Sequence, residues 1–366
     1  MQRIAISTLA QFEALRERWD ELYGADTTAT LFLSSAWLSA YVSAAPYPWT
    51  ILTLQDDDDA LVAALPISIR RAPHPRLPVG RELTFAAQPI ADYNGMLARP
   101  GREADAVREL AAWLGSMRWD RARFEDAEDS RVAALFAALG PDARRTVGSP
   151  EVCYYIDLPA TFEEFLARLS TPTRRATLRG GKRIAQLLPT ARITRAVDGD
   201  AAAHIDAVLA VNRTRWGGSG IRERRFRRLL QAAYDAGCAR FHVVWDGARP
   251  IAGAASFVDA SRGTYASWLL SHDPAYGKLS PGRALLATVV GEAIAEGFAT
   301  FDFLRGDDAY KKSYATGHRT NTTFTVDRSG PRALLLRGAQ PLYRWVRAAA
   351  VAAIVRPKRA ARVREG

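Results

Sequence analysis

The chain has 366 residues, of which 48% are hydrophobic and 24% are charged, and its formal net charge is +11. This composition excludes a disordered chain, and the length exceeds what one ordinary hydrophobic core holds, so two domains are expected. No stretch of the sequence approaches the roughly 20 apolar residues that span a bilayer, and two isolated cysteines exclude a disulfide framework.

The pattern of the first 150 residues predicts helices mixed with a sheet. Apolar spacing predicts helices over 11–23, 31–42, 103–117 and 130–139, and strands over 49–55, 61–70, 81–87 and 121–126. Four consecutive acids at 56–59 join the first two strands. We interpret them as a solvated hairpin turn and expect no metal site, because cation ligands normally converge from a loop with glycine at its sharp turn.

The pattern restarts near Pro150 and continues into a basic segment. A strand is expected over 153–158 and a helix over 162–169, with Thr161 as its cap and Glu164 completing a capping-box pattern. In the next segment, 170–188, a basic set lies largely on one side of a helix that two glycines interrupt; its members are Arg174, Arg175, Arg179, Lys182 and Arg183. Such a face either holds phosphates or is simply solvated, and both interpretations stay open.

An antiparallel meander and one further helix–strand pair follow. Helices are expected over 202–215 and 224–236, strands over 239–245, 250–258 and 264–270, a helix over 283–296 and a strand over 300–304. The sequence Ser280-Pro281-Gly282-Arg283 suits a helix start, with Ser280 as the cap and Pro281 in the first turn. Free amide groups there, together with the Arg283 charge, predict an anion site.

The segment 299–314, ATFDFLRGDDAYKKSY, concentrates reactive side chains at the end of a strand. In open α/β sheets, ligands lie just outside the carboxyl ends of strands. The alternative is an ordinary strand-to-helix connection with solvated charges. The order of elements upstream favours a functional site.

The tail, residues 331–366, holds most of the net charge. It carries nine basic residues and one acid, so it accounts for eight of the eleven net positive charges. Tyr343, Trp345 and an apolar run lie between these charges. The tail either lies on an anionic membrane surface or packs as a helix with a frayed basic end. Nucleic acid is not an expected partner, because the sequence contains no known nucleic-acid-binding motif.

The chain resembles the FemAB-like, CelD/BcsL-type branch of the GNAT acyltransferase superfamily. The motifs that carry this resemblance are TRRATLRGGKR, RTRW, RPIAGAASF, SHDPAYGKLSPGRALL and FDFLRGDDAYKKSY, with FLSSAWLSAY and ADYNGML in the first half. The resemblance implies an α/β (α+β) fold of two tandem GNAT-like domains with mixed, mostly antiparallel sheets flanked by helices. It places an acceptor-side domain at 1–150 and an acyltransferase domain at 151–330, and it does not extend to the basic amphipathic helical tail at 331–366.

The resemblance also implies where the ligands bind. Acyl-CoA would be a co-substrate rather than a permanently bound cofactor, held where strands 264–270 and 300–304 diverge. Its binding residues would be Leu270, Ser280, Pro281, Gly282, Arg283 and Tyr314, the last replacing the tryptophan that is common in the family. The acceptor would contact Asp92, Tyr93, Arg175, Arg179, Arg215, Trp216 and Arg305.

The chemistry needs a positioned acid and base rather than a cysteine nucleophile. We expect Tyr310 to be the general acid, with Tyr314 second, and Lys311 and Arg305 to neutralise charge. The proton of the acceptor would go to Asp302 or Asp307. His272, on the loop after the third meander strand, is a further candidate base, although a lone loop histidine is more often structural.

Three functions remain open from the sequence. The first is acyl-CoA-dependent N- or O-acylation in cell-envelope biosynthesis, with a sugar, a polysaccharide precursor or an amino-lipid as acceptor. The second is a FemAB-like ligase that uses aminoacyl-tRNA, and the third is a non-catalytic assembly partner at the membrane. We expect a cytoplasmic protein, peripheral on the inner membrane face if the tail binds lipid, and the sequence does not specify its oligomeric state.

Overall fold

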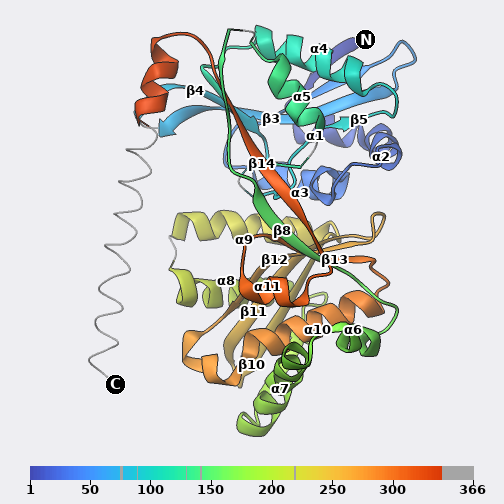
Figure 1. Cartoon of the computed structure of the whole chain (residues 1–366), viewed down its shortest axis with the longest axis vertical. Helices are drawn as coiled ribbons and strands as arrows, with labels where there is room; N and C mark the ends of the chain where they lie inside the picture. Colours follow the sequence, from blue (N-terminus) through green and yellow to red (C-terminus); the bar gives the residue numbers. More distant parts are fainter. Residues whose placement is uncertain (75–76, 89, 129, 141, 218–219, 340–366) are drawn as a thin grey trace.

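The two halves of the chain share one long mixed sheet with helices on its faces (Figure 1). A computed structural model describes residues 1–74, 77–88, 90–128, 130–140, 142–217 and 220–339. Along the sheet, the strands are β1 (Gln2–Ile6), β2 (Thr50–Gln55), β3 (Leu61–His74), β4 (Leu77–Phe85), β6 (Arg121–Ala127), β14 (Gly317–Asp327), β8 (Glu151–Asp157), β13 (Thr300–Arg305), β12 (Thr264–His272), β11 (Arg249–Asp259), β10 (Ala239–Asp246) and β9 (Ala191–Arg195). Two short strands, β5 (Leu97–Ala98) and β7 (Arg144–Val147), pair with β3 and β14.

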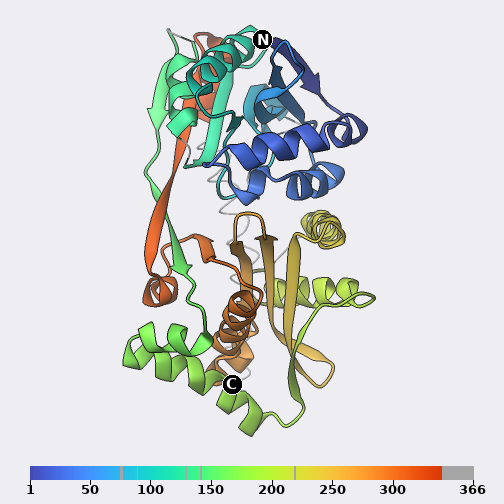
Figure 2. The ribbon, with the colours of Figure 1, turned by 90° about the vertical axis from the view of Figure 1, so that its right-hand side faces the viewer.

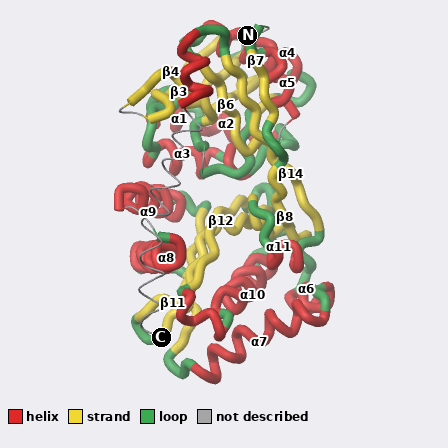
Figure 3. Tube along the Cα trace, turned by 60° about the vertical axis from the view of Figure 1, so that its left-hand side comes forward, coloured by secondary structure: helices red, strands yellow, loops and turns green. Residues whose placement is uncertain are grey.

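The helices divide between the two halves. The first half contains α1 (Leu9–Glu13), α2 (Arg16–Ala25), the 3-10 turn η1 (Leu31–Leu33), α3 (Ser35–Ala44), α4 (Glu103–Ser116) and α5 (Ser130–Ala138). The second contains α6 (Phe162–Arg168), α7 (Thr171–Leu187), α8 (Ala201–Trp216), α9 (Gly220–Asp235), the 3-10 turn η2 (Pro274–Leu279), α10 (Pro281–Ala295) and α11 (Ala309–Tyr314). In Figure 3, α10 and α7 lie on one side of the lower sheet and α8 and α9 on the other.

Both halves follow the same plan, which confirms the expected α/β architecture. In each half, antiparallel strands lead into a crossover helix and then into a strand that pairs in parallel. The parallel pairs are β4–β6, joined through α4, and β12–β13, joined through α10. All other pairs registered between strands of the described residues are antiparallel.

Strand β14 connects the halves, and it is not predicted by the sequence pattern. Its first part, from Gly317 to Asn321, pairs with β8, and its second part, from Thr322 to Asp327, pairs with β6 (Figure 2). A run rich in threonine over 320–325 is β-branched and suits a strand. The halves also share a hydrophobic core, in which Phe257 of β11 packs against Phe32 and Trp37 with ring centroids 6.3 and 6.0 Å apart.

Two local predictions in the first half need correction. The helix expected over 11–23 is broken between α1 and α2, which lets the fully buried rings of Phe12 and Trp19 meet edge to face at 5.0 Å. The helix expected over 31–42 begins as the 3-10 turn η1, and Ser34 then caps α3 by accepting a hydrogen bond from the Trp37 amide. The acidic turn at 56–59 is a hairpin turn, as predicted, in which the Asp56 carboxylate accepts from the Ala60 amide.

The basic helix α7 is continuous, so the predicted interruption by two glycines is wrong. Gly180 lies where α7 crosses the first turn of α10, and a Cβ atom there would be 3.0 Å from the Ala284 amide nitrogen and 3.1 Å from the Ser280 carbonyl oxygen. Gly181 faces outward and has nothing within 4 Å of its Cβ direction. Gly180 therefore permits close helix packing rather than breaking the helix.

This packing predicts a difference between two adjacent substitutions. Gly180→Leu is expected to lower the free energy of unfolding by about 2 kcal/mol, because backbone atoms of α10 cannot yield to the added side chain. Gly181→Leu is expected to be neutral or to stabilise by up to about 1 kcal/mol, since leucine is the better helix former. Urea unfolding of both variants tests this, and equal midpoints would show that the α7–α10 contact is not tight.

Candidate functional site

The parallel strands β12 and β13 separate partway along their length. They pair only at three positions, the last being Ala266 opposite Asp302. Beyond it, β12 carries a bulge at Trp268, because Ser267 lies opposite Ser256 while Leu269 lies opposite Ala255. On the other side, Leu304 of β13 has a left-handed φ of 57°. A bulge and a left-handed residue re-aim strands, so the two strands diverge where the sequence analysis expects the acyl donor.

One corner of this opening gathers four of the predicted residues. Nη1 of Arg215, at the end of α8, lies 2.9 Å from Nδ1 and 3.2 Å from Nε2 of His272, at the end of β12. A Cβ atom on Gly282, in the first turn of α10, would lie 3.2 Å from the same Nδ1. The guanidinium of Arg215 also lies over the Trp216 ring, 5.0 Å from its centroid. Arg215, Trp216, His272 and Gly282 therefore surround one point at the carboxyl end of β12.

The start of α10 differs from the prediction. Ser280 is the N-cap residue, as predicted, but it has a left-handed conformation, φ 57° and ψ 46°, and its side chain accepts no hydrogen bond from an amide of the turn. The amides of Arg283 and Ala284 both donate to the Ser280 carbonyl, and Pro281 has no N–H. Among the described residues, the Gly282 amide is the one in this turn without a hydrogen-bond partner. The predicted anion site thus offers fewer free amide groups than an ordinary helix start.

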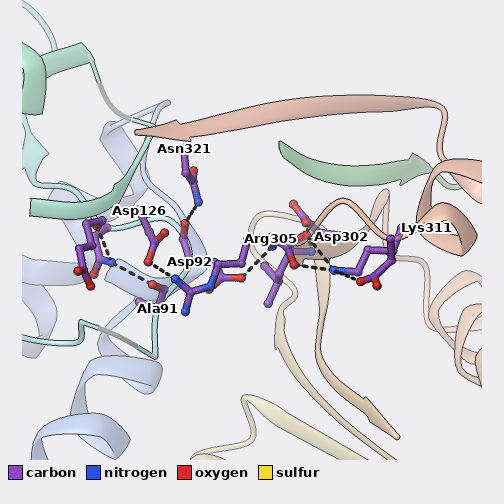
Figure 4. A network of polar contacts seen from close by, with 11 residues as sticks. Ala91, Asp92, Asp126, Asp302, Arg305, Lys311 and Asn321 are labelled. Carbon is purple, nitrogen blue, oxygen red and sulfur yellow. Dashed lines mark hydrogen bonds and ion pairs between the residues drawn. The ribbon is translucent and has the colours of Figure 1, made fainter. Parts of the chain in front are cut away.

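A buried ionic joint lies at the junction of the two halves (Figure 4). Arg305, at the end of β13, forms ion pairs with Asp92, at 3.0 Å, and with Asp126. The Arg305 amide also donates to Asp92 at 2.9 Å, and Asn321 of β14 donates to the Asp92 carbonyl. Asp126 has a left-handed φ of 55°, a conformation that costs on the order of 1 kcal/mol. The joint therefore combines strain with ion pairing, and sequence reasoning missed Asp126 and Asn321.

Burial raises the pKa values of the carboxyl groups in this region. Both aspartates that pair with Arg305 are buried, and burial raises the pKa of Asp126 to about 7 and also raises the pKa of Asp92. Burial likewise raises the pKa of Asp302 to about 6. The Asp302 carboxylate accepts hydrogen bonds from the Tyr93 hydroxyl at 2.8 Å and from the Leu304 amide at 2.7 Å. Only 1% of the Asp302 surface is exposed, whereas the predicted role, taking a proton from the acceptor, needs an accessible carboxylate.

Lys311 lies inside the fold rather than toward a ligand. Its Nζ donates to the Arg305 carbonyl at 2.5 Å and lies 3.7 Å from the Asp308 carboxylate. Burial lowers the pKa of Lys311, and 7% of the residue is exposed. Figure 4 shows it beside Asp302 and the end of β13. The Lys311 ammonium therefore faces the end of β13 and the buried carboxylates.

The other predicted residues of α11 and the loop before it differ in how far they are buried. Half-buried Tyr310 packs against Phe303 edge to face at 6.1 Å, and burial raises its pKa to about 12, so it stays protonated at neutral pH. Tyr314 is buried, and its hydroxyl lies 2.6 Å from that of Thr177, so it ties α11 to α7. Asp307 is exposed and accepts from the Tyr154 hydroxyl.

The predicted arginines of α7, together with Leu270 and Arg283, have simpler surroundings. Arg175 and Arg179 are exposed on the outer face of α7, away from the ionic joint. Leu270 is half-buried on β12 opposite Ala254, and Arg283 is half-buried in the first turn of α10. The structure brings the corner residues together and assembles the joint, but it does not bring the α7 arginines to either.

The raised pKa of Asp126 predicts how stability changes with pH. Its folded pKa, about 7, exceeds the unfolded value of about 4, so the folded state binds this proton more tightly. The free energy of unfolding is therefore expected to fall as pH rises from about 4 to about 7, by up to about 1.4 kcal/mol per unit from this group. Asp126→Asn should remove most of that slope in urea unfolding between pH 4.5 and 7.5. Asp57→Asn, in the exposed acidic turn, is the control, and equal slopes for all three proteins would contradict the assignment.

Comparisons with known proteins give a family match within the second half and a similar fold for the whole chain. Residues 172–312 match the family model of the acetyltransferase (GNAT) domain. FemX is a similar solved structure, with a TM-score of 0.62 and 12% identity over 94% of this chain and 100% of that one. The C-terminal domain of a lysylphosphatidylglycerol synthetase from Agrobacterium fabrum is also similar, with a TM-score of 0.54 and 12% identity over 92% of this chain and 98% of that one. No curated protein matches the chain by sequence.

A third solved structure repeats the arrangement of two halves. It is a tandem GNAT protein from the clavulanic acid biosynthesis pathway, with a TM-score of 0.50 and 13% identity over 90% of this chain and 99% of that one. At such identities these likenesses concern the fold. Residues 172–312 therefore match a GNAT acetyltransferase domain, and the whole chain shares the fold of FemX and of the tandem GNAT protein.

Proposed function

We propose that the protein transfers an acyl group from acyl-CoA to an amine or hydroxyl group of an acceptor used in cell-envelope biosynthesis. The observation that carries this proposal is the divergence of β12 and β13 beyond Ala266, with α10 beginning beside it. The edge of β12 past that point has no registered partner on the β13 side in the part of the chain that the structure describes. Such an edge suits the extended, amide-bearing arm of coenzyme A, whose pyrophosphate would lie at Gly282 and Arg215.

The reaction is direct attack in a ternary complex. The acceptor nitrogen or oxygen bonds to the thioester carbonyl carbon, the carbon–sulfur bond breaks, and the departing thiolate takes a proton. Tyr310, protonated at neutral pH, supplies that proton. Burial, and next the Arg215 charge, lower the pKa of His272, so its ring is neutral beside the pyrophosphate position. The proton of the acceptor passes to the exposed carboxylate of Asp307. Arg305, with 34% of its side chain exposed, would contact the acceptor.

Ligand binding by the whole protein tests the donor assignment. At a coenzyme A concentration about 100 times its Kd, the folded state gains about 2.7 kcal/mol, which raises Tm by several degrees. We expect acetyl-CoA, longer acyl-CoA and free coenzyme A each to raise Tm, and their ranking to report the preferred chain length. Arg215→Gln should reduce the shift, and Arg224→Gln, an exposed arginine of α9, should not. No shift with any of the three ligands would refute the donor assignment.

A second candidate function is a ligase that takes its acyl group from aminoacyl-tRNA. The exposed cations of α7 favour it, since they form no ion pair with any described residue and phosphates would complement them. This alternative predicts turnover that falls steeply with salt, and turnover with free acyl-CoA would exclude it. A non-catalytic role is the third alternative, which detectable thioester cleavage by the wild type would remove.

A peripheral position at the inner membrane face remains part of the proposal. Residues 331–339 are helical, with Ala333 and Leu336 buried and Leu334 and Leu335 more than half exposed. Leu336 packs beside Gly80 of β4, so the tail begins on the first half. Residues 340–366, which hold most of the predicted membrane contact, lie outside the described residues. No helix of the described segments combines the length and apolarity that crossing a bilayer requires.

A further inference from the structure

Helix α7 presents a strongly basic face to solvent. Its buried residues recur every three or four positions, at Thr173, Thr177, Gly180 and Ile184, and pack toward α10 and α11. The rest of its surface carries five cations and no acid, all exposed: Arg174, Arg175, Arg179, Lys182 and Arg183. Of these, Arg183 donates to the Lys278 carbonyl, and the other four make no ion pair with any residue in the described ranges. This face therefore has no anionic partner among the residues that the structure describes.

Apolar surface lies among these cations. Leu178 is 44% exposed and sits one turn from Arg174, Arg175 and Lys182. A groove of about 410 Å³ runs beside it between α7 and α10, lined mainly by apolar and small residues that include Phe162, Leu178, Ile193, Ala284, Ala287 and Gly291. At the carboxyl end of the helix, Leu187 is 62% exposed. Leu178 thus shares one surface with the cations, next to an apolar groove, whereas Leu187, two and a half turns further along, lies on the opposite side of the helix.

We propose that α7 and this groove dock the protein on an anionic lipid bilayer. Cations on a helix face attract anionic headgroups, and a leucine side chain at the same surface enters the boundary between headgroups and acyl chains. Long arginine and lysine side chains can reach the headgroups while Leu178 inserts. RNA would use the same charges, but α7 has no aromatic residue on which a base could stack, and an exposed leucine adds nothing to phosphate binding. The inference does not depend on the acyl-transfer proposal.

A fluorophore on α7 tests the contact locally. Gln186 is exposed one turn after Lys182, and both native cysteines are buried, so Gln186→Cys can be labelled selectively in the full chain. We expect the emission of an environment-sensitive label there to shift to the blue with phosphatidylglycerol vesicles and not with phosphatidylcholine vesicles. The same label at Arg224→Cys on α9 should not shift. If only the tail binds the vesicles, the label at position 186 stays unchanged and the proposal is overturned.

Two sets of unlabelled variants separate lipid from RNA and from general charge attraction. Arg175→Gln/Arg179→Gln/Lys182→Gln should weaken vesicle binding roughly 100-fold, at about fivefold per cation. Arg224→Gln/Arg225→Gln/Arg228→Gln removes the same charge from exposed positions of α9 and should weaken binding far less. Leu178→Ser should weaken vesicle binding severalfold without changing charge. Equal loss in both triple variants, or tight tRNA binding by a Leu178→Ser protein that binds vesicles as the wild type does, would overturn the proposal.

Discussion

Replacement of Lys311 by methionine is expected to destabilise the protein by about 3 kcal/mol and to abolish acyl transfer. The ammonium group donates to the Arg305 carbonyl at 2.5 Å and is buried among carboxylates, of which Asp92 and Asp302 act on its charge. Methionine keeps the volume but leaves that carbonyl without its donor and removes one of the cations that act on the buried carboxylates. Removal of one partner from a buried charged group costs about 3–5 kcal/mol, and relief of the buried ammonium offsets part of this.

The adjacent lysine supplies the control for this experiment. Lys312 is exposed, and Lys312→Met should change the unfolding free energy by less than about 0.5 kcal/mol and leave turnover intact. Urea unfolding gives the stability of each variant, and thioester cleavage measured where both remain folded gives the activity. A Lys311→Met protein as stable as the wild type would show that the ammonium does not support the strand end. Full activity in that protein would show that Lys311 has no part in positioning the site.

The clustering of Asp302, Arg305 and Lys311 was predictable from the sequence, but their contacts were not. Asp302 and Arg305 lie in β13 and Lys311 follows it, all within ten residues, so the rule for strand ends predicts that they cluster. Their partners come from the other half: Tyr93 is 209 positions from Asp302, and Asp126 is 179 from Arg305. No local pattern reports such a separation. Some of the ionisable groups that look most reactive in the sequence therefore form hydrogen bonds and ion pairs between the two halves.

The same distinction between local and long-range information explains the fold. Hydrophobic periodicity predicted the meander, the crossover helix α10 and strand β13, because each is decided within a dozen residues. It did not predict that Gly180 lies inside a continuous helix, since the reason is the backbone of α10 a hundred residues later. Nor did it predict β14, whose pairing with both β6 and β8 depends on the tandem arrangement.

Arg305→Met should be the most destabilising substitution between the two halves. The variant leaves Asp92 and Asp126 buried without their shared cation, at an expected cost of about 3–5 kcal/mol near pH 7.5. Because burial already raises the pKa of both carboxyls, they take up protons readily once the guanidinium is gone. The destabilisation should therefore shrink as pH falls toward 5. The surface pair of Arg3 and Glu109, broken by Arg3→Met, should cost less than about 1 kcal/mol at either pH.

A double-mutant cycle shows whether this effect belongs to the joint itself. Asp126→Asn removes one of the two carboxylates, so Arg305→Met/Asp126→Asn should be destabilised by clearly less than the sum of the single variants. A coupling energy of about 1–3 kcal/mol at pH 7.5 that declines at pH 5 would follow from a shared buried cation, since protonation of Asp126 mimics its replacement by asparagine. Strict additivity at both pH values would mean that Arg305 stabilises the junction through packing. In that case the two halves are joined by β14 and the Phe32–Trp37–Phe257 contacts, and the ionic network does not hold them together.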